Sequence, residues 1–272
     1  MKGNLAKMKA ELGSTIDYQL PVGDDLLPLN GLLGKPITLN FSGTIHCVHC
    51  SRKTNKSFNQ GFCYPCFKKL AQCDQCIVSP EKCHFHLGTC REPEWGETHC
   101  FIEHIVYLSN TSKPKVGITR HTQVPTRWID QGAVAALPIF TVQSRLQSGK
   151  VEHVFKDHIA DKTNWRNMLK GVVDDVDLGA LRDELFAATQ SDVTALQDEY
   201  GVQAIQHITD GDLVELNFPV LEYPTKVVSL NPEKTPDITG TLMGIKGQYL
   251  ILDIGVINIR KHGGYEVEVI AG

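Results

Sequence analysis

Cysteine placement constrains the fold of this chain more than any other feature of its sequence. All nine cysteines fall between Cys47 and Cys100, in a chain of 272 residues. Three Cys-x-x-Cys pairs come first, and three single cysteines follow them. One such pair directs two thiolates from a tight turn, and two pairs complete a tetrahedral metal site. The sequence therefore predicts a metal-binding segment over residues 46–100.

The first two pairs have the spacing of a zinc ribbon. Twelve residues, mostly polar, separate the first pair from the second. The predicted zinc ligands are Cys47, Cys50, Cys63 and Cys66. A closed four-thiolate site leaves no coordination position for water or substrate, so the predicted ion has a structural role rather than a catalytic one.

The later cysteines predict a second metal site. Its predicted ligands are Cys73, Cys76, Cys83 and Cys90, with His84, His86 or His99 as a replacement for one member. Spacing leaves an interleaved pairing open, in which the first and third pairs share one ion. Four thiolates also suit an iron–sulfur cluster, which is the alternative to a second zinc. Cys100 is left over and is expected to be a buried free thiol.

Disulfide bonds are the competing use of these cysteines. Disulfide frameworks belong to small secreted chains that lack a core, whereas this chain is long and 42% hydrophobic. Met1–Gly13 is polar and charged, without the apolar run of a secretory signal. No stretch approaches the roughly 18 apolar residues that cross a bilayer. We therefore expect reduced, metal-binding thiols, a cytoplasmic location and no membrane association.

The charge balance limits the possible partners. A formal net charge of −4 argues against a dedicated non-specific DNA-binding protein, which would usually be basic. A local basic patch is still compatible with the sequence, because Arg52, Lys53 and Lys56 lie in the loop of the expected ribbon.

Patterning along the chain predicts an α+β protein with five parts. Polar–apolar alternation and glycine-rich corners near the C-terminus are typical of short strands in a small β-barrel. The parts are 1–45, strands that are candidates to pair with the C-terminal sheet; 46–100, the zinc-binding segment; 101–171, an α/β domain; 172–210, a helical linker; and 211–272, the small β-barrel.

Individual elements follow from hydrophobic periodicity. The expected helices cover residues 4–12, 127–136, 150–161 and much of 172–208. The expected strands cover residues 15–20, 36–45, 104–109, 114–119, 138–143, 213–218, 226–230, 238–245, 248–253, 256–260 and 265–270.

The α/β part carries a candidate catalytic constellation. His104-Ile-Val-Tyr107-Leu and Lys115-Val-Gly117-Ile-Thr119 form an expected hairpin. Arg127 follows on a helix, and Glu152 lies on a later helix. This order resembles the GIY-YIG nuclease domain, which has a hairpin with paired tyrosines, an arginine on the first helix and a metal-binding glutamate on a later helix. The motif letters differ, since Ile105-Val106-Tyr107 and Lys115-Val-Gly117 stand in their place.

The resemblance implies a role for each residue. In GIY-YIG nucleases a hairpin tyrosine or lysine helps to activate water, the arginine stabilises charge on the phosphate, and the glutamate holds one divalent ion. It thus implies Tyr107, Lys115, Arg127 and Glu152 as catalytic residues. It also implies Mg²⁺ or Mn²⁺ at the glutamate and a nucleic-acid substrate. A metal-bound water and a cation opposite the phosphate suit phosphodiester hydrolysis.

Each of these residues also has a purely structural interpretation. Tyr107 suits a strand core, Lys115 a solvated strand end, and Arg127 a packing partner for Trp128. The remaining member, Glu152, suits an ion pair with the lysine four positions later. The alternative function is a non-catalytic zinc-ribbon module that binds nucleic acid or a protein partner.

The whole chain is similar to an uncharacterised bacterial family of domains of unknown function. The shared features are the cysteine array, the stretch from Pro80 to Arg91, the Lys115-Val-Gly-Ile-Thr119 hairpin and the helix Arg127-Trp-Ile-Asp-Gln-Gly-Ala133. This similarity implies an architecture with a zinc ribbon and a GIY-YIG-like domain, and it implies no mechanism.

Overall fold

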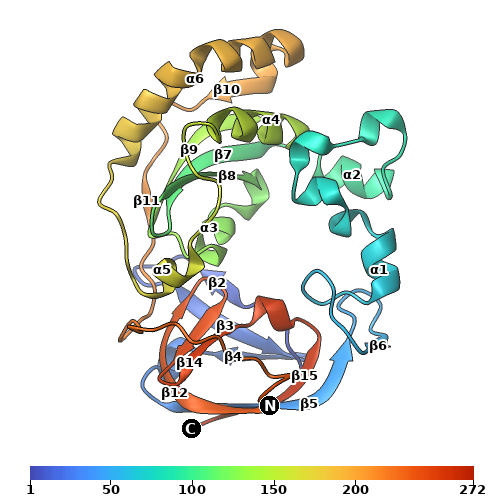
Figure 1. Cartoon of the computed structure of the whole chain (residues 1–272), viewed down its shortest axis with the longest axis vertical. Helices are drawn as coiled ribbons and strands as arrows, with labels where there is room; N and C mark the ends of the chain where they lie inside the picture. The colour runs from blue at the N-terminus through green and yellow to red at the C-terminus, as the bar shows by residue number, and fades with distance from the viewer.

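The computed structural model describes residues 1–272 as an α+β fold with three antiparallel sheets (Figure 1). The largest sheet has seven strands and combines both ends of the chain. Its order is β1 (Lys2–Asn4), β15 (Tyr265–Ala271), β5 (Pro36–His46), β12 (Asp237–Lys246), β13 (Tyr249–Leu252) and β14 (Gly255–Asn258), and β6 (Lys53–Thr54) pairs with β5. The termini therefore lie close together.

No sheet closes into a barrel, so the prediction of a C-terminal β-barrel is wrong. A second, three-stranded sheet supplies the opposing layer instead. It consists of β2 (Lys9–Glu11), β3 (Asp17–Val22) and β4 (Asp25–Pro28). Because this sheet buries the apolar face of the larger one, the larger sheet needs no closure to form a core.

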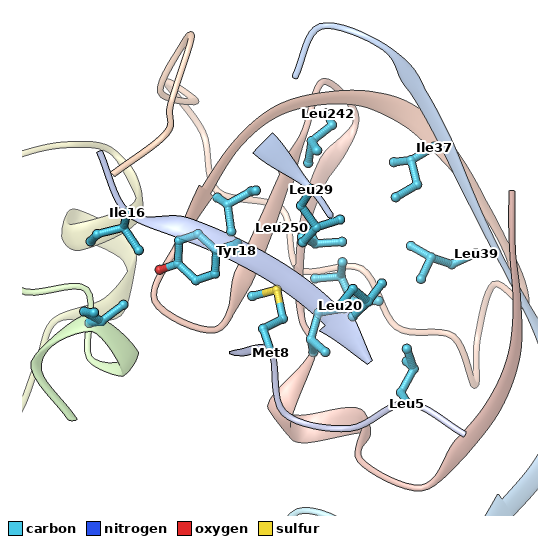
Figure 2. Close-up of a cluster of buried hydrophobic side chains, with 14 of the residues drawn as sticks. Leu5, Met8, Ile16, Tyr18, Leu20, Leu29, Ile37, Leu39, Leu242 and Leu250 are labelled. Atoms are coloured by element: carbon cyan, nitrogen blue, oxygen red, sulfur yellow. The ribbon is translucent and has the colours of Figure 1, made fainter. Parts of the chain in front are cut away.

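Figure 2 shows the side chains between these two sheets. Tyr18 and Leu20 of β3 are fully buried with Leu39 of β5 and Leu250 of β13. Residues from the first and last parts of the chain thus form one hydrophobic core.

The predicted helix over residues 4–12 is absent, and that region forms the end of β1, an irregular connection and β2. Leu5 and Met8 enter the core just described, and both are fully buried. The Met8 N–H donates to Gln248 Oε1 at 2.9 Å, and Gln248 Nε2 donates to the Met8 carbonyl at 3.1 Å. Long-range partners therefore satisfy the backbone groups that a helix would have paired locally.

The third sheet has five strands and two buried faces. Its order is β10 (Ile205–His207), β9 (Ala135–Val142), β7 (His104–Asn110) and β8 (Pro114–Arg120), and β11 (Val214–Glu215) pairs with β9. Helices α4 (Arg145–Phe155) and α6 (Leu178–Tyr200) cover one face, where Val106 and Leu108 are buried (Figure 1). On the other face Tyr107 packs against Trp128 of α3 (Thr126–Asp130) and joins the core of the first two sheets.

Hairpin β7–β8 confirms the expected strands at residues 104–109 and 114–119. The helix expected over residues 127–136 is shorter, because Gly132 has a φ of +71° and β9 begins at Ala135. The strand expected over residues 226–230 is reduced to one isolated bridge, between Ser229 and Val256. The remaining elements are α5 (Trp165–Leu169) and the 3-10 turns η1 (Asn30–Leu32), η6 (His121–Gln123), η7 (Val202–Ala204) and η8 (Arg260–His262).

The cysteine-rich part connects β5 of the seven-stranded sheet to β7 of the five-stranded sheet. Apart from β6, it contains only short elements: α1 (Tyr64–Lys69), α2 (Pro93–His99), η2 (Ala71–Cys73), η3 (Gln75–Ile77), η4 (Pro80–Lys82) and η5 (Phe85–Leu87). It packs on α4 at Gly149, where a Cβ atom would lie 2.5 Å from Pro80 Cβ. Among all the helices, none combines the length and apolar character needed to traverse a bilayer.

Candidate functional site

The first candidate site is the cluster of the first four cysteines. The sulfur atoms of Cys47, Cys50, Cys63 and Cys66 all lie within 4.8 Å of one another. The Sγ atoms of Cys50 and Cys63 are 3.8 Å apart. Four thiolates at a Zn–S distance of about 2.3 Å stand about 3.8 Å from each other, so the cluster is consistent with a structural zinc site.

Local backbone geometry brings these thiols together. Cys47 follows directly after β5, and its carbonyl accepts a hydrogen bond from the Ser51 N–H at 2.9 Å. Ser51 follows the second cysteine of this pair and adopts a left-handed φ of 57°. The chain therefore turns tightly between Cys50 and strand β6. Cys63 is the residue immediately before α1, whose first turn carries Cys66. Each pair is therefore set by one turn, as its spacing in the sequence predicts.

The pocket that brings together the other predicted ligands of a second site does not include Cys73. Cys76, Cys83 and Cys90 line one pocket together with Cys100, and Cys73 does not line it. Of the predicted histidine substitutes, only His84 is in this lining.

A second candidate site is a polar pocket of about 420 Å³ where the three parts of the molecule meet. Its walls come from the end of β8, from α3 and α4, and from η3 and η4 of the cysteine-rich part. Lys7, between β1 and β2, and Arg260, in η8, complete them. The charged side chains that line it are Lys7, Arg120, Arg127, Arg145, Arg260, Asp130 and Glu152. Five cations thus face two carboxylates.

Two of the four predicted catalytic residues line this pocket, and the other two are buried outside its lining. Arg127 and Glu152 are in the lining. Lys115 is 4% exposed, and Tyr107 is fully buried. The Tyr107 ring lies over Gly117, where a Cβ atom would be 2.8 Å from the tyrosine oxygen, so only glycine fits at this position of the hairpin.

Electrostatic interactions connect the four residues. Burial, together with the nearby cation of Arg127, lowers the pKa of Lys115 to about 8, against the opposing effect of Glu152. Burial raises the pKa of Tyr107, and the cation of Arg127 opposes that shift. The Tyr107 hydroxyl donates to Gln131 Oε1 at 3.1 Å. The structure therefore brings the four residues close enough for their charges to interact.

Glu152 also makes the ion pair that its structural interpretation predicts. Lys156 Nζ lies 3.4 Å from Glu152 Oε2, one helical turn further along. Burial raises the pKa of the Glu152 carboxyl, and Lys156 partly offsets this shift. The carboxylate is 13% exposed, so it keeps a path to the pocket.

The other pocket residues were not expected from the sequence. Asp130 Oδ2 lies 2.5 Å from Lys7 Nζ and 3.9 Å from an Arg260 guanidinium nitrogen. Arg145 donates from its guanidinium to the Ile77 carbonyl at 2.5 Å. These residues come from separate segments and share no motif, so only the tertiary fold reveals that they converge.

Comparison with known proteins gives a family and no functional assignment. No curated protein and no solved structure matches the chain. One family model, described as a protein of unknown function (DUF2797), matches residues 34–267. That range includes the four-cysteine cluster, the five-stranded sheet and six of the seven charged residues that line the pocket. The chain belongs to the DUF2797 family.

Proposed function

We propose that this protein is a divalent-metal-dependent nuclease that hydrolyses a phosphodiester bond at the polar pocket. The observation that carries the proposal is the convergence of four residues. Arg127 and Glu152 line the pocket, and the buried Lys115 and Tyr107 interact electrostatically with both of them. These are the residues to which the resemblance to GIY-YIG nucleases gives catalytic roles. The order of hairpin, helix, strand and helix also supports the resemblance.

The charge of the pocket suits a polyanion. Asp130 is already paired with Lys7 and lies near Arg260, so it contributes little negative charge to an incoming ligand. Arg120, Arg127 and Arg145 make no ion pair with a carboxylate. Guanidinium groups bind phosphate oxygens in a bidentate manner, and clustered cations attract nucleic acid even to a protein of net negative charge.

Glu152 is the residue that would hold the divalent ion. Mg²⁺ is commonly bound by one or two carboxylates together with substrate phosphate oxygens and water, so a single pocket carboxylate fits that requirement. The ion would supply a water molecule of lowered pKa as the nucleophile. The structural zinc at the first four cysteines would have no part in the reaction, because its coordination is closed.

The other three residues would act around the phosphate. Arg127 would balance the negative charge that develops on the phosphate oxygens in the transition state. Lys115, whose pKa is about 8, is partly neutral in mildly basic solution and would accept a proton from the attacking water. Tyr107 is buried against Gly117, so it would position the hairpin at the back of the site.

The proposal is tested by cleavage of labelled DNA and RNA, single-stranded, duplex and branched, with Mg²⁺ or Mn²⁺. We expect cleavage by the wild type and a loss of about 100-fold or more in Glu152→Gln. Glu184→Gln, which changes an exposed glutamate on α6, is the matched control and keeps wild-type activity. Equal cleavage by Glu152→Gln and wild type would refute the site. Binding without cleavage on every substrate would instead establish a non-catalytic nucleic-acid-binding module.

A further inference from the structure

Four cysteines converge on a pocket that is separate from the zinc cluster. Cys76, Cys83, Cys90 and Cys100 line it, each from a different turn of the chain. Cys76 lies in η3, Cys83 follows η4, and Cys100 ends α2. No disulfide joins any of them. Four free thiols that meet from four turns form a complete donor set for a metal centre.

The segment around these thiols has little regular secondary structure and no hydrophobic core of its own. Residues 71–100 contain four 3-10 turns and one helix of seven residues, and they form no strand. None of the three hydrophobic core clusters of the protein includes a residue of this stretch. Segments of this kind are organised by metal binding, since a ligand set held by one centre replaces a core.

The distances between the thiols differ from those of the first cluster. All four sulfurs of the first cluster lie within 4.8 Å of one another, whereas no three of the sulfurs of Cys76, Cys83, Cys90 and Cys100 do. A single zinc ion requires sulfur atoms about 3.8 Å apart. In a four-iron, four-sulfide cluster each thiolate binds a different iron, so the cysteine sulfurs stand further from each other than around one zinc ion.

The surroundings of the pocket are apolar and aromatic. Phe85 and Phe101 pack edge to face, with ring centroids 4.5 Å apart, and both line the pocket beside Trp95. Apolar burial restricts solvent access, and solvent exposure is one of the factors that set the reduction potential of an iron–sulfur cluster.

A mononuclear alternative at the same place uses ligands that are already occupied. Asp74, Cys76 and His84 have ligand atoms within 4.8 Å of one another. However, Asp74 Oδ2 lies 2.8 Å from the Arg91 Nε, and its Oδ1 accepts from the Gln75 N–H at 2.6 Å. This set also contributes only one thiol, and it leaves the other three cysteines of the pocket without a role.

We propose that Cys76, Cys83, Cys90 and Cys100 hold an iron–sulfur cluster. The cluster is a second metal centre, distinct from the zinc site, and its ligand set excludes Cys73. It does not depend on the proposed nuclease activity.

The centre would adjoin the helix that carries Glu152. The backbone N–H of Arg145, the first residue of α4, donates to the Cys100 carbonyl at 2.7 Å. The Arg145 guanidinium donates to the carbonyl of Ile77, the residue after Cys76. Loss of the cluster would therefore displace Arg145, which lines the polar pocket.

The test is anaerobic purification of the full chain, followed by measurement of iron, acid-labile sulfide, zinc and visible absorbance. We expect a brown protein with iron and sulfide in equal amounts, together with one zinc per chain. Cys100→Ser should lose most of the iron and keep the zinc, whereas Cys73→Ser, the matched control, should keep both.

Three outcomes would overturn the proposal. The first is a colourless wild type with two zinc ions per chain. The second is a wild type that takes up no iron on anaerobic incubation with ferrous iron and sulfide. The third is loss of iron in Cys73→Ser but not in Cys100→Ser. The wild-type measurements stand even where a variant fails to fold.

Discussion

The cysteine-rich part and the polar pocket are built on opposite principles. Residues 47–100 form short helices and 3-10 turns around thiols, without a large hydrophobic core. The pocket residues Arg127 and Glu152 stand on α3 and α4, which are packed on a sheet with two buried faces. In the cysteine-rich part, metal binding by the thiols is expected to stabilise the fold. At the pocket, a fold that is already stable positions the charged side chains. Substitutions in the two regions should therefore separate stability from activity.

The largest effect is expected at the cluster of Cys47, Cys50, Cys63 and Cys66, the candidate zinc site. Cys63→Ser removes a buried thiolate, and structural zinc contributes about 10 kcal/mol or more to the folding of small zinc modules. We expect zinc loss and rapid proteolysis within residues 47–100, while the sheets remain protected. Limited proteolysis with mass spectrometry measures this effect. A chelator should produce the same proteolysis in the wild type. An unchanged proteolytic pattern after zinc removal would contradict the view that metal binding stabilises the cysteine-rich part.

At the pocket the expected effect is on catalysis. Arg127→Ala removes the cation that the proposed mechanism places opposite the phosphate, so the rate of cleavage should fall by about 100-fold to 1000-fold, or about 3–4 kcal/mol of transition-state stabilisation. The melting temperature should change little, because Arg127 lines the pocket. Arg52→Ala, at an exposed position between the two cysteine pairs of the first cluster, is the control. A matching loss of activity in that control would indicate that nucleic acid is recognised at the cysteine-rich part.

A buried lysine provides a third case for comparing the two regions, because its charge neither binds a metal nor lines the polar pocket. Lys246 is fully buried, its ammonium has no hydrogen-bond partner, and it lies 5.3 Å from the Phe218 ring centroid and 5.1 Å from that of Tyr223. Burial lowers its pKa to about 8. Below that pH the folded state bears the cost of the buried charge, which the two aromatic rings offset only in part.

Stability should therefore rise with pH above about 8, where the folded protein releases this proton while the unfolded chain keeps it up to pH 10.5. Lys246→Met should stabilise the protein at pH 7 by up to about 3 kcal/mol. It should also remove this rise between pH 8 and pH 10, the range to be compared by denaturant unfolding of both proteins. A destabilised variant at pH 7 would show that the ammonium has a favourable partner.

The smallest expected effect lies at the joint between the two regions. Gly149→Ala places a methyl group 2.5 Å from Pro80 Cβ and 2.7 Å from the Glu81 nitrogen. Overpacking of this kind costs about 1–3 kcal/mol, which exceeds the gain in helix propensity. Thermal melting should show the loss. Gly31→Ala, where nothing lies within 4 Å of the new atom, serves as the control.

Sequence reasoning succeeds where local spacing decides the structure. The α+β class and the cluster of the first four cysteines are confirmed, because two tight turns place the four thiols. The expected barrel and the helix over residues 4–12 are wrong, because strands from the start of the chain complete the C-terminal sheet and cover it. The approach of Cys100 to the second thiol pocket, and of Arg145 to the polar pocket, depends on tertiary contacts that no local pattern encodes.

Parallel measurement of nucleic-acid cleavage and thermal melting for Glu152→Gln tests the central claim most directly. Loss of Mn²⁺-dependent cleavage at an unchanged melting temperature, with zinc content equal to that of the wild type, is the predicted result. Cleavage at the wild-type rate in a folded Glu152→Gln protein would contradict the account.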